Sequence, residues 1–500
     1  MSITVALSIA GTGVSTYSRM AEIAANNIAN ADDEGFVRKD ADLAALVRDG
    51  RGVGVEVAGI LRHANTALAR DARREGALSA LFDAQAEALQ AYALELGQPD
   101  ERRSVAAALA RLEEAFISLA ETPESPSLQR QVVVAAKEVA GNLNRLSAAI
   151  GRLREQAEAD LQTEVQTVNQ SLAELHKVND AIKLHSARGH DVSALEDQRD
   201  RLIDTINELI PVREIRRAPN DILLLTAEGV PLFDGRPAQI AFSRTTVIPP
   251  GAVYDPNGTA GPGHISVLSG LTVDGRDLAP GSGDAQALTS GRIAGLFAVR
   301  DEVMVQFQQQ IDQLASGLAD RFQDPANDPT LAPGAPGLFT AQGAAHDRTD
   351  PADIVGMAAR IAVNAAVDPE QGGAAWRVRD GVGAATPGAP GDPAQVFRFL
   401  ATFGDSLTFP AASGLPASLT LRATGRELVG AQQSARADAA SRAERQKVVA
   451  QALHDTRLNA TGVNVDSELQ KMLVIERSYA ANANVVQTAA RMLDQLLAIA

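Results

Sequence analysis

A long and nearly unbroken repeat of apolar residues constrains the fold of this chain more than any other feature. The repeat keeps the four–three spacing of a coiled-coil seam and drifts once by about one position. Its members are Val139, Leu143, Leu146, Ile150, Leu153 and Ala157, then Leu161, Val168, Leu172, Leu175 and Ile182. The spacing predicts one helix over residues 127–187, roughly 90 Å long at 1.5 Å per residue. Because no single compact domain needs such a helix, we expect an elongated molecule or a helical bundle.

The composition excludes several classes of function. The 500 residues include 46 Lys and Arg against 62 Asp and Glu, a formal net charge of −16, which argues against broad nucleic-acid binding and against docking on an anionic membrane. The chain has no cysteine, so disulfides, thiolate metal sites and cysteine nucleophiles are excluded. Aromatic residues make up 4% and the hydrophobic class 45% of the chain, which favours long helices with narrow seams over a large aromatic core.

Further helices surround a turn-rich middle. Periodic apolar residues predict helices near 12–31, 65–98, 105–119, 193–209, 292–322 and 427–500, the last interrupted at 460–462. Short apolar runs between Gly and Pro predict strands at 222–226, 239–242, 264–268 and 418–423, and a hairpin around 52–57. We therefore expect a mainly α fold with an inserted β-rich part. It would be an elongated helical bundle or coiled-coil stem from both termini, with one or two turn-rich outer domains.

This pattern divides the chain into six segments. They are an N-terminal helix and hairpin at 1–75, a long-helix stem domain at 76–210, a β-rich outer domain at 211–290, a returning stem helix at 291–323, a Gly/Pro-rich mixed outer domain at 324–425 and C-terminal coiled-coil helices at 426–500. Narrow seams cannot stabilise isolated helices. We therefore expect the two ends of the chain to pair with each other.

The last helix carries a seam of its own. The residues that step by four and three are Val465, Leu469, Met472, Glu476, Tyr479, Ala483, Val486, Ala490, Leu493 and Leu497. A charged residue, Glu476, lies on this seam, and the seam narrows to small residues at Ala483 and Ala490. A small-residue seam lets helices approach closely and suits packing among many copies. The pattern alone favours one core helix of an ordinary bundle.

Two short motifs, one near each end of the chain, point to a family. The N-terminal one is the run Ala25-Asn26-Asn27-Ile28-Ala29-Asn30, followed by Gly35-Phe36. The C-terminal one is Gly462-Val463-Asn464-Val465-Asp466-Ser467-Glu468-Leu469 with Ser478-Tyr479 and Asn482-Ala483. Together they resemble the terminal signatures of bacterial flagellar axial proteins, which form the rod, the hook and the hook-associated structures.

Three internal segments resemble the hook–filament junction branch of this family. They lie around Leu112 to Arg130, around Val178 to Asp200 with Leu195-Glu196-Asp197-Gln198-Arg199-Asp200, and at Gly291-Arg292-Ile293-Ala294-Gly295-Leu296 with Arg300-Asp301. The resemblance covers about 1–210, 285–322 and 427–500. The sequence departs from the family pattern at Asp32-Asp33-Glu34, where a Thr-containing turn is frequent, and at Val37-Arg38-Lys39.

The resemblance implies a non-enzymatic structural subunit that joins hook and filament by coiled-coil assembly of its terminal helices. The implied partners are copies of itself in a ring, the hook protein, a second junction or filament protein and an export chaperone, with no nucleic acid, membrane or cofactor. The implied location is the extracellular flagellum, after export from the cytoplasm without a cleaved signal. The assembly residues would be Asn26, Asn27, Ile28, Asn30, Gly35, Phe36, Val465, Leu469, Met472, Glu476, Tyr479, Asn482, Ala483, Val486, Ala490 and Leu493. The asparagines would either bridge neighbouring helices or serve as ordinary helix caps.

Two alternatives remain open on sequence grounds. The first is another axial subunit, of the hook or the filament. The second is a secreted hydrolase with its site in 211–425, because one sequence cannot exclude a carboxylate pair. No His-Glu-x-x-His or Gly-x-Ser-x-Gly motif occurs, and we interpret the seven histidines as surface residues. We interpret Trp376 as a strand core residue rather than a ligand platform.

Overall fold

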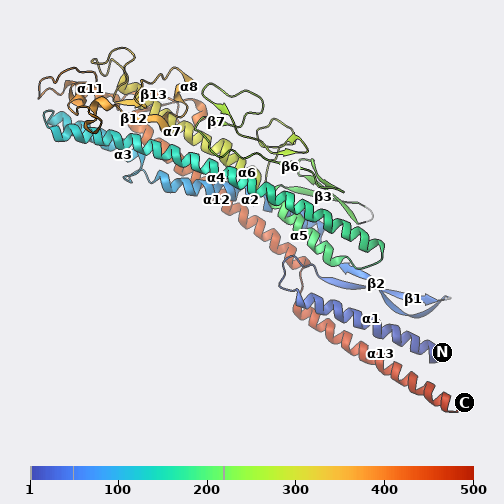
Figure 1. Ribbon diagram of the computed structural model, residues 1–500. Helices are drawn as coiled ribbons and strands as arrows, with labels where there is room; N and C mark the ends of the chain where they lie inside the picture. The colour runs from blue at the N-terminus through green and yellow to red at the C-terminus, as the bar shows by residue number, and fades with distance from the viewer. Residues whose placement is uncertain (1–2, 49, 218–219, 500) are drawn as a thin grey trace. The chain divides into compact units, whose positions relative to one another are not determined.

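The computed structural model describes residues 3–48, 50–217 and 220–499 and is mainly helical, with small sheets (Figure 1). The long elements are α1 (Ile3–Ala29), β1 (Lys39–Arg48), β2 (Arg51–Arg62), α2 (Thr66–Leu96), α3 (Val105–Glu121), α4 (Pro126–Ala187), α5 (Ser193–Leu209), β3 (Val212–Arg217), β4 (Asp221–Thr226), β5 (Pro231–Asp234), α6 (Arg292–Ala298), α7 (Met304–Gln323), α11 (Ala394–Thr402), α12 (Leu421–Thr461) and α13 (Val465–Ile499). The short ones are β6 (Ile240–Ala241), β7 (Ala252–Val253), β8 (Ile265–Ser266), β9 (Thr272–Val273), β10 (Arg276–Asp277), β11 (Phe339–Ala341), α8 (Pro351–Ile354), α9 (Met357–Arg360), β12 (Ile361–Val363), α10 (Arg377–Asp380), β13 (Ser406–Thr408) and β14 (Ser418–Thr420).

The chain forms two compact units. The terminal unit combines Met1–Ala77, Thr167–Ala238 and Lys447–Ala500, and the middle unit combines Leu78–Gln166 and Gln239–Gln446. Helices α2, α4 and α12 contribute residues to both units. The expected fold class is confirmed, because helices dominate, the sheets are small insertions, and the first and last helices pack together.

In the terminal unit, α1 packs against α13 and against the β1–β2 hairpin (Figure 1). The hairpin is antiparallel, with Lys39 opposite Arg62 and Arg48 opposite Arg51. Glycine permits the close approach of the strand to the helix, since a Cβ on Gly54 would lie 2.1 Å from Oγ1 of Thr12. The predicted hairpin is therefore present, and the first helix begins nearer the N-terminus than the expected residue 12.

The rest of the terminal unit is built around α5. This helix contacts β2 and β3, and β3, β4 and β5 form an antiparallel three-stranded sheet. The prediction of α5 is confirmed at 193–209, and that of the long helix to within one residue, at Pro126–Ala187. Helix α4 carries the long apolar repeat, and α5 has apolar residues at Ile203, Ile206 and Leu209, a spacing that predicts a helix.

The middle unit contains an aromatic core that the composition did not predict. Phe116 of α3, Phe322 of α7 and Phe399 of α11 are fully buried, with ring centroids 5.5–6.1 Å apart. Phe339 and Phe403 complete the cluster. The expectation of narrow seams in place of an aromatic core is wrong here, because the few Phe residues of the chain converge on one place instead of being spread along it.

The returning helix expected at 292–322 is interrupted. A π-helical turn at Val299–Val303 separates α6 from α7 and carries Arg300. Its guanidinium is fully buried and pairs with Glu158 of α4 over 2.6 Å. Arg154 donates to the backbone carbonyl of Arg300 over 2.8 Å. A π-helical turn within an α-helix is frequently found at functional sites. Here it carries Arg300, whose buried ion pair with Glu158 joins the α6–α7 segment to α4.

The irregular part of the middle unit contains shorter strands than expected. The strand predicted at 239–242 covers only Ile240–Ala241, and the one at 264–268 only Ile265–Ser266. The strand predicted at 418–423 ends at Thr420, where α12 begins. Among the described residues, no helix has the length and hydropathy of a membrane span.

Candidate assembly site

Two asparagines of the N-terminal run have different roles: Asn27 forms a polar clamp between elements, and Asn30 caps the helix. Asn27 is fully buried. Its Nδ2 donates to the backbone carbonyl of Lys39 over 2.8 Å and to Oε2 of Glu468 over 3.1 Å, and its Oδ1 accepts from the backbone N–H of Lys39 over 3.1 Å. The amide of Asn27 therefore ties α1 to β1 and α13. Asn26 is exposed, and Asn30 caps the end of α1 by donating to the carbonyl of Asn26 over 2.8 Å. Ile28 is half-buried.

The C-terminal signature meets the N-terminal one at Glu468. This side chain is 1% exposed. Lys471 donates to Glu468 over 2.8 Å and to Asp40 over 2.9 Å, and His63 lies 2.6 Å from the second oxygen of Asp40. Burial alone would raise the pKa of Asp40, but hydrogen bonds from Lys471 and His63 hold this pKa below its ordinary value. The two signatures, which lie at opposite ends of the sequence, are thus joined by one polar network.

The turn that follows α1 is fixed by an aspartate. Oδ1 of Asp33 accepts from the backbone N–H of Gly35 over 2.9 Å, and Oδ2 of Asp33 lies 3.4 Å from Arg201. A Cβ on Gly35 would lie 2.6 Å from the side chain of Arg201, which explains the glycine. Phe36 is buried, with the ammonium of Lys39 4.4 Å from its ring centroid. The acidic turn is therefore stabilised by a hydrogen bond from its own backbone to the Asp33 side chain.

Buried ion pairs connect the hairpin to α5. Arg62 of β2 lies 2.7 Å from Asp197 and 2.8 Å from Asp200. Lys39 of β1 lies 2.9 Å from Asp197. Burial would raise the pKa of Asp200, but the charge and hydrogen bond of Arg62 hold it below its ordinary value. Removal of one partner from such a buried pair leaves an uncompensated charge.

The same helix also holds the end of α12. Asp204 of α5 lies 2.5 Å from Arg73 and 2.9 Å from Arg457. The backbone N–H of Arg38 donates to the carbonyl of Thr461, the last residue of α12, over 2.9 Å. The acidic segment 195–200 and the residues just after it are thus the electrostatic hub of the terminal unit. The sequence distinguished this segment only by its resemblance to the family. Its ion pairs were not predictable, because a run of charged residues does not show which distant residues are its partners.

Helix α13 faces α1 with a different stripe from the seam that the sequence suggested. The buried residues of α13 are Glu468, Ile475 and Ala489. Asn482 lies on the same stripe at a seven-residue spacing, and a Cβ on Gly13 of α1 would lie 2.6 Å from its Oδ1. Close helix approach therefore occurs at a glycine and an asparagine.

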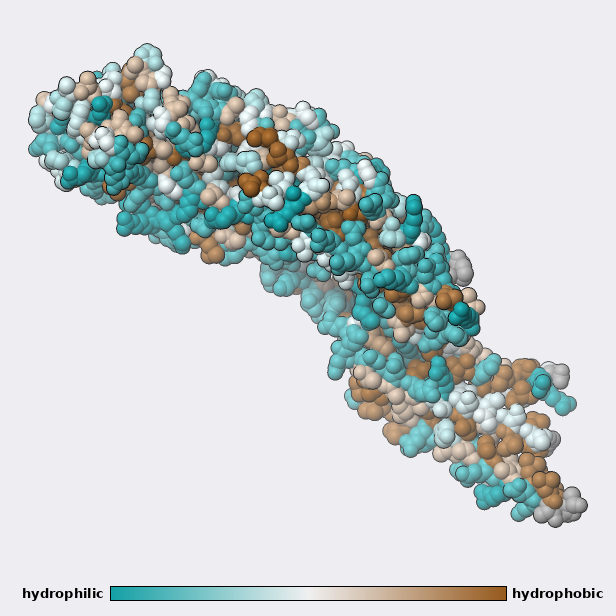
Figure 2. Space-filling view, viewed as in Figure 1, coloured by the Kyte–Doolittle hydropathy of each residue, from teal (hydrophilic) through white to brown (hydrophobic). Residues whose placement is uncertain are grey.

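The suggested seam lies beside this contact. Val465, Leu469, Glu476, Tyr479 and Ala490 are exposed, and Met472, Ala483, Val486 and Leu493 are half-buried. Further apolar side chains, Val474, Val485, Met492 and Leu496, are 47–62% exposed at spacings of eleven, seven and four, which place them on one side of a helix. Figure 2 shows brown, apolar side chains on the visible face of the α1–α13 pair. We call these two sets the outer stripes of α13.

A buried serine–histidine–aspartate chain occurs in the middle unit. Nε2 of His346 lies 2.7 Å from Oγ of Ser316, and Nδ1 lies 3.0 Å from Asp353. The arrangement has the order of a hydrolase triad, but Ser316 is 0% and His346 3% exposed. The chain therefore serves to satisfy buried polar groups, and the interpretation of all histidines as surface residues is wrong for His346.

The other candidates for chemistry resolve as follows. Trp376 is half-buried with helical backbone angles just before α10, so its interpretation as a strand core residue is wrong. The guanidinium of Arg377 lies 5.2 Å from its ring centroid. Among the described residues, no group of three or more His, Asp or Glu side chains is arranged to hold a metal ion.

Comparisons with known proteins give a consistent family. Residues 98–337 match the family described as the helical domain of the flagellar hook-associated protein FlgK, and residues 455–499 match the C-terminal family of the flagellar basal body rod proteins FlgEFG. The flagellar hook-associated protein 1 of Bacillus subtilis (strain 168) is 24% identical over 217 residues, which are 41% of this chain and 43% of that protein.

A solved structure is also similar. The flagellar hook junction protein FlgK of Burkholderia pseudomallei matches with a TM-score of 0.44 and 18% sequence identity, over 54% of this chain and 46% of the other. The matches thus span less than half the length of either relative.

Proposed function

Because the chain belongs to the family of flagellar hook-associated proteins, we propose that it is a structural subunit of the hook–filament junction, assembled through its terminal helices. The observation that carries the proposal is the pair of apolar outer stripes on α13. They lie on a helix whose α1-facing side is already occupied by the Asn27–Glu468 network. The polar network fixes the pair, and the stripes remain for neighbouring subunits.

The energetics support assembly through these stripes. Leu469 is 49%, Val485 47% and Leu496 54% exposed. Full burial of such side chains stabilises by about 1.5–3 kcal/mol each, so covering the exposed half gains about 1 kcal/mol per residue. Several stripes of this kind, repeated in every subunit, offset the entropy of association. The assembly residues on α13 that the sequence suggested, such as Val465 and Tyr479, belong to this exposed surface.

The partners in this proposal are of four kinds. Copies of the chain form a ring, the hook protein contacts it on one side, and a second junction or filament protein contacts it on the other. An export chaperone holds the subunit before assembly, and the final location is the extracellular flagellum after export without a cleaved signal. The chain has no catalytic role in this proposal, since the family is a structural one and Ser316 of the triad-like chain is fully buried.

The experiment alters the outer stripes without touching the clamp. The double variant L469S/Y479S removes two exposed apolar side chains, so we expect an unchanged circular dichroism spectrum and a free energy of unfolding within about 0.5 kcal/mol of wild type. We expect loss of self-association in sedimentation and loss of filament growth on hooks. The control I117S/V134S removes two similarly exposed apolar side chains from α3 and α4 in the middle unit. Normal filament growth with L469S/Y479S would contradict the proposal.

A further inference from the structure

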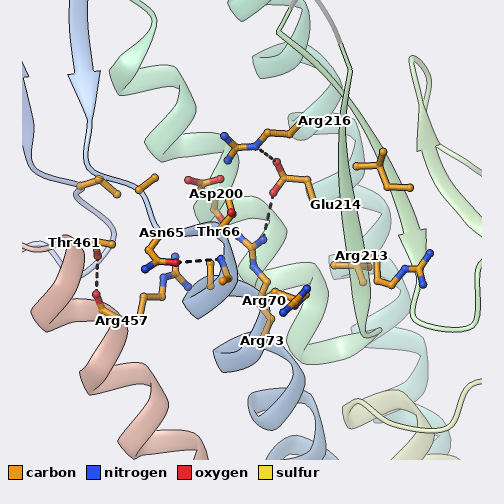
Figure 3. Close-up of a pocket in the computed structure, with 16 residues that line it drawn as sticks. Asn65, Thr66, Arg70, Arg73, Asp200, Arg213, Glu214, Arg216, Arg457 and Thr461 are labelled. Carbon is orange, nitrogen blue, oxygen red and sulfur yellow. Dashed lines mark hydrogen bonds and ion pairs between the residues drawn. The ribbon is translucent and has the colours of Figure 1, made fainter. Parts of the chain in front are cut away.

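A cavity in the terminal unit has no role in the proposal above. Its volume is about 530 Å³, and it is lined by residues of α2, α5, β3 and the end of α12 (Figure 3). The size lies within the range of ordinary ligand pockets. Five arginines line it, Arg70, Arg73, Arg213, Arg216 and Arg457, against two carboxylates, Asp200 and Glu214. The lining therefore carries a formal charge excess of +3 in a chain whose net charge is −16.

Part of this positive charge is neutralised within the chain. Arg73 and Arg457 both pair with Asp204. Arg216 lies 2.9 Å from Glu214. These pairs neutralise part of the lining and leave a smaller number of cations available.

Two arginines remain without a strong partner. Arg70 has a 72% exposed side chain, and its ion pair, with the adjacent Asp71, is 3.5 Å long. Arg213 is exposed, and among the residues that the structure describes it has no ion-pair partner. The N-terminus of α2 also borders the pocket, but the side chain of Asn65 already caps the backbone N–H groups of Ala67 and Leu68. The guanidinium groups are therefore the part of the lining that favours carboxylates.

The terminal unit also carries the complementary group. Asp32, Asp33 and Glu34 follow one another in the turn after α1, and all three are exposed. Their ion pairs are long, 3.4 Å from Asp33 to Arg201 and 3.4 Å from Glu34 to His454. None of the three lines the pocket of its own chain. This is the turn at which the sequence departs from the pattern of its family.

We propose that the acidic turn 32–34 of a second copy of this chain docks in the arginine pocket. The inference rests on the proposed self-assembly and names a contact that this particular sequence adds to it. The turn and the pocket lining share no residue, so each subunit offers its turn to one neighbour and its pocket to another. Such a heterologous contact generates a ring or a helix. Exposed ion pairs are weakened by salt, so the contact sets the choice of neighbour and depends on ionic strength.

The first experiment uses the absence of native cysteine. Two variants with tags of different mass, E34C and R213C, are mixed and mildly oxidised. We expect a disulfide between the two different chains. The control mixes R213C with D42C, which replaces an exposed acidic residue on β1. A yield of mixed disulfide no higher than in this control would overturn the proposal.

The second experiment exchanges charges. D32R/E34R leaves Asp33 and its hydrogen bond to Gly35 in place, and R70E/R213E alters only exposed side chains. We expect each variant alone to self-associate at least tenfold more weakly than wild type at low salt, because like charges then face each other. An equimolar mixture regains association, since reversed turn and reversed pocket are again complementary.

The outcomes separate this inference from the proposed function. Wild-type association that is unchanged by both charge reversals, yet lost in L469S/Y479S, would reject the pocket contact and keep the stripes. A wild-type chain that remains monomeric would contradict both. Weakening of both variants without rescue in the mixture would show a general charge effect and would also reject the pocket contact.

Discussion

The two units of this molecule stabilise themselves by different means. Eleven of the thirteen Phe residues lie in the middle unit, where Phe116, Phe322 and Phe399 form one buried cluster. The terminal unit is held at its centre by polar groups, with Asn27 0% and Glu468 1% exposed. The middle unit therefore completes its core alone, whereas the terminal unit leaves apolar side chains on the outside of α13. The difference supports the proposal that neighbouring subunits cover the terminal unit.

A polar clamp suits a pair of helices that must hold one register. Apolar seams of small residues slide with little penalty, but the Asn27 amide is satisfied only when Lys39 and Glu468 are both in place. A single buried Asn sets register in coiled coils in the same way, at a cost in stability. The clamp fixes α1 against α13, so the outer stripes keep a defined position for the proposed assembly.

The largest expected effect tests the self-sufficiency of the middle unit. Phe322→Ala removes a fully buried ring that contacts Phe116, Phe339, Phe399 and Phe403. We expect a loss of about 3–5 kcal/mol in the free energy of unfolding, measured by urea denaturation, with amide exchange in α1 and α13 unchanged. Phe397→Ala, which alters a 55% exposed ring on α11, is the control and should change little. If amide exchange in α1 became as fast as in the middle unit, the two units would not be stabilised independently.

A smaller effect tests the polar clamp. Asn27→Ala leaves the backbone groups of Lys39 and the buried Glu468 without their partner, so we expect a loss of about 1–3 kcal/mol. The loss should appear as faster amide exchange in α1, β1 and α13. Asn26→Ala, one residue earlier and exposed, is the matched control. If N26A and N27A behaved alike, the run would act through helix propensity and not through the clamp.

The smallest effect separates the units by pH. Burial is the main reason that the pKa of His346 lies below its ordinary 6.5. The unfolded chain then takes up the proton on His346 first, so this residue contributes a loss of stability as pH falls through about 6.5. Asp312 of the same unit contributes the opposite change, because burial raises its pKa to about 7 and the folded chain takes up that proton first. The pKa of Asp40 also lies below its ordinary value of 3.8, because Lys471 and His63 outweigh burial. The terminal unit should therefore lose this contribution only below about pH 4.

Amide exchange at pH 7, 5 and 3.5, expressed as protection factors, measures the pH at which the stability of each unit changes. As pH falls from 7 to 5, we expect amide protection around Ser316 to change by the sum of the His346 and Asp312 contributions, and protection around Asn27 to stay the same. His346→Gln, which cannot take up a proton, removes the destabilising contribution, so between pH 7 and 5 this variant should gain protection around Ser316 relative to wild type. Simultaneous loosening of both units at pH 5 would contradict the assignment.

Local signals in the sequence were sufficient for the long helices. The apolar repeat located α4 to within one residue, and α5 was found at its observed bounds. The strands of the irregular part were harder, because strands such as Ile240–Ala241 have only two residues. Their position depends on partners far along the chain and not on period-two alternation. The signatures at the two ends were also recognisable from sequence, since each is a contiguous run.

What the sequence determined by itself was thus the period of the helices and the identity of the terminal runs. Only the tertiary structure decided that Asn27 and not Asn26 is the clamp, that α13 turns Glu468 and Ile475 to α1, and that His346 is buried. Periodicity defines stripes on a helix, but it does not say which stripe a neighbour covers. That choice depends on the fit of groups that are hundreds of residues apart, such as Gly13 and Asn482 or Asn27 and Glu468. A buried polar side chain is stable only where such a partner arrives.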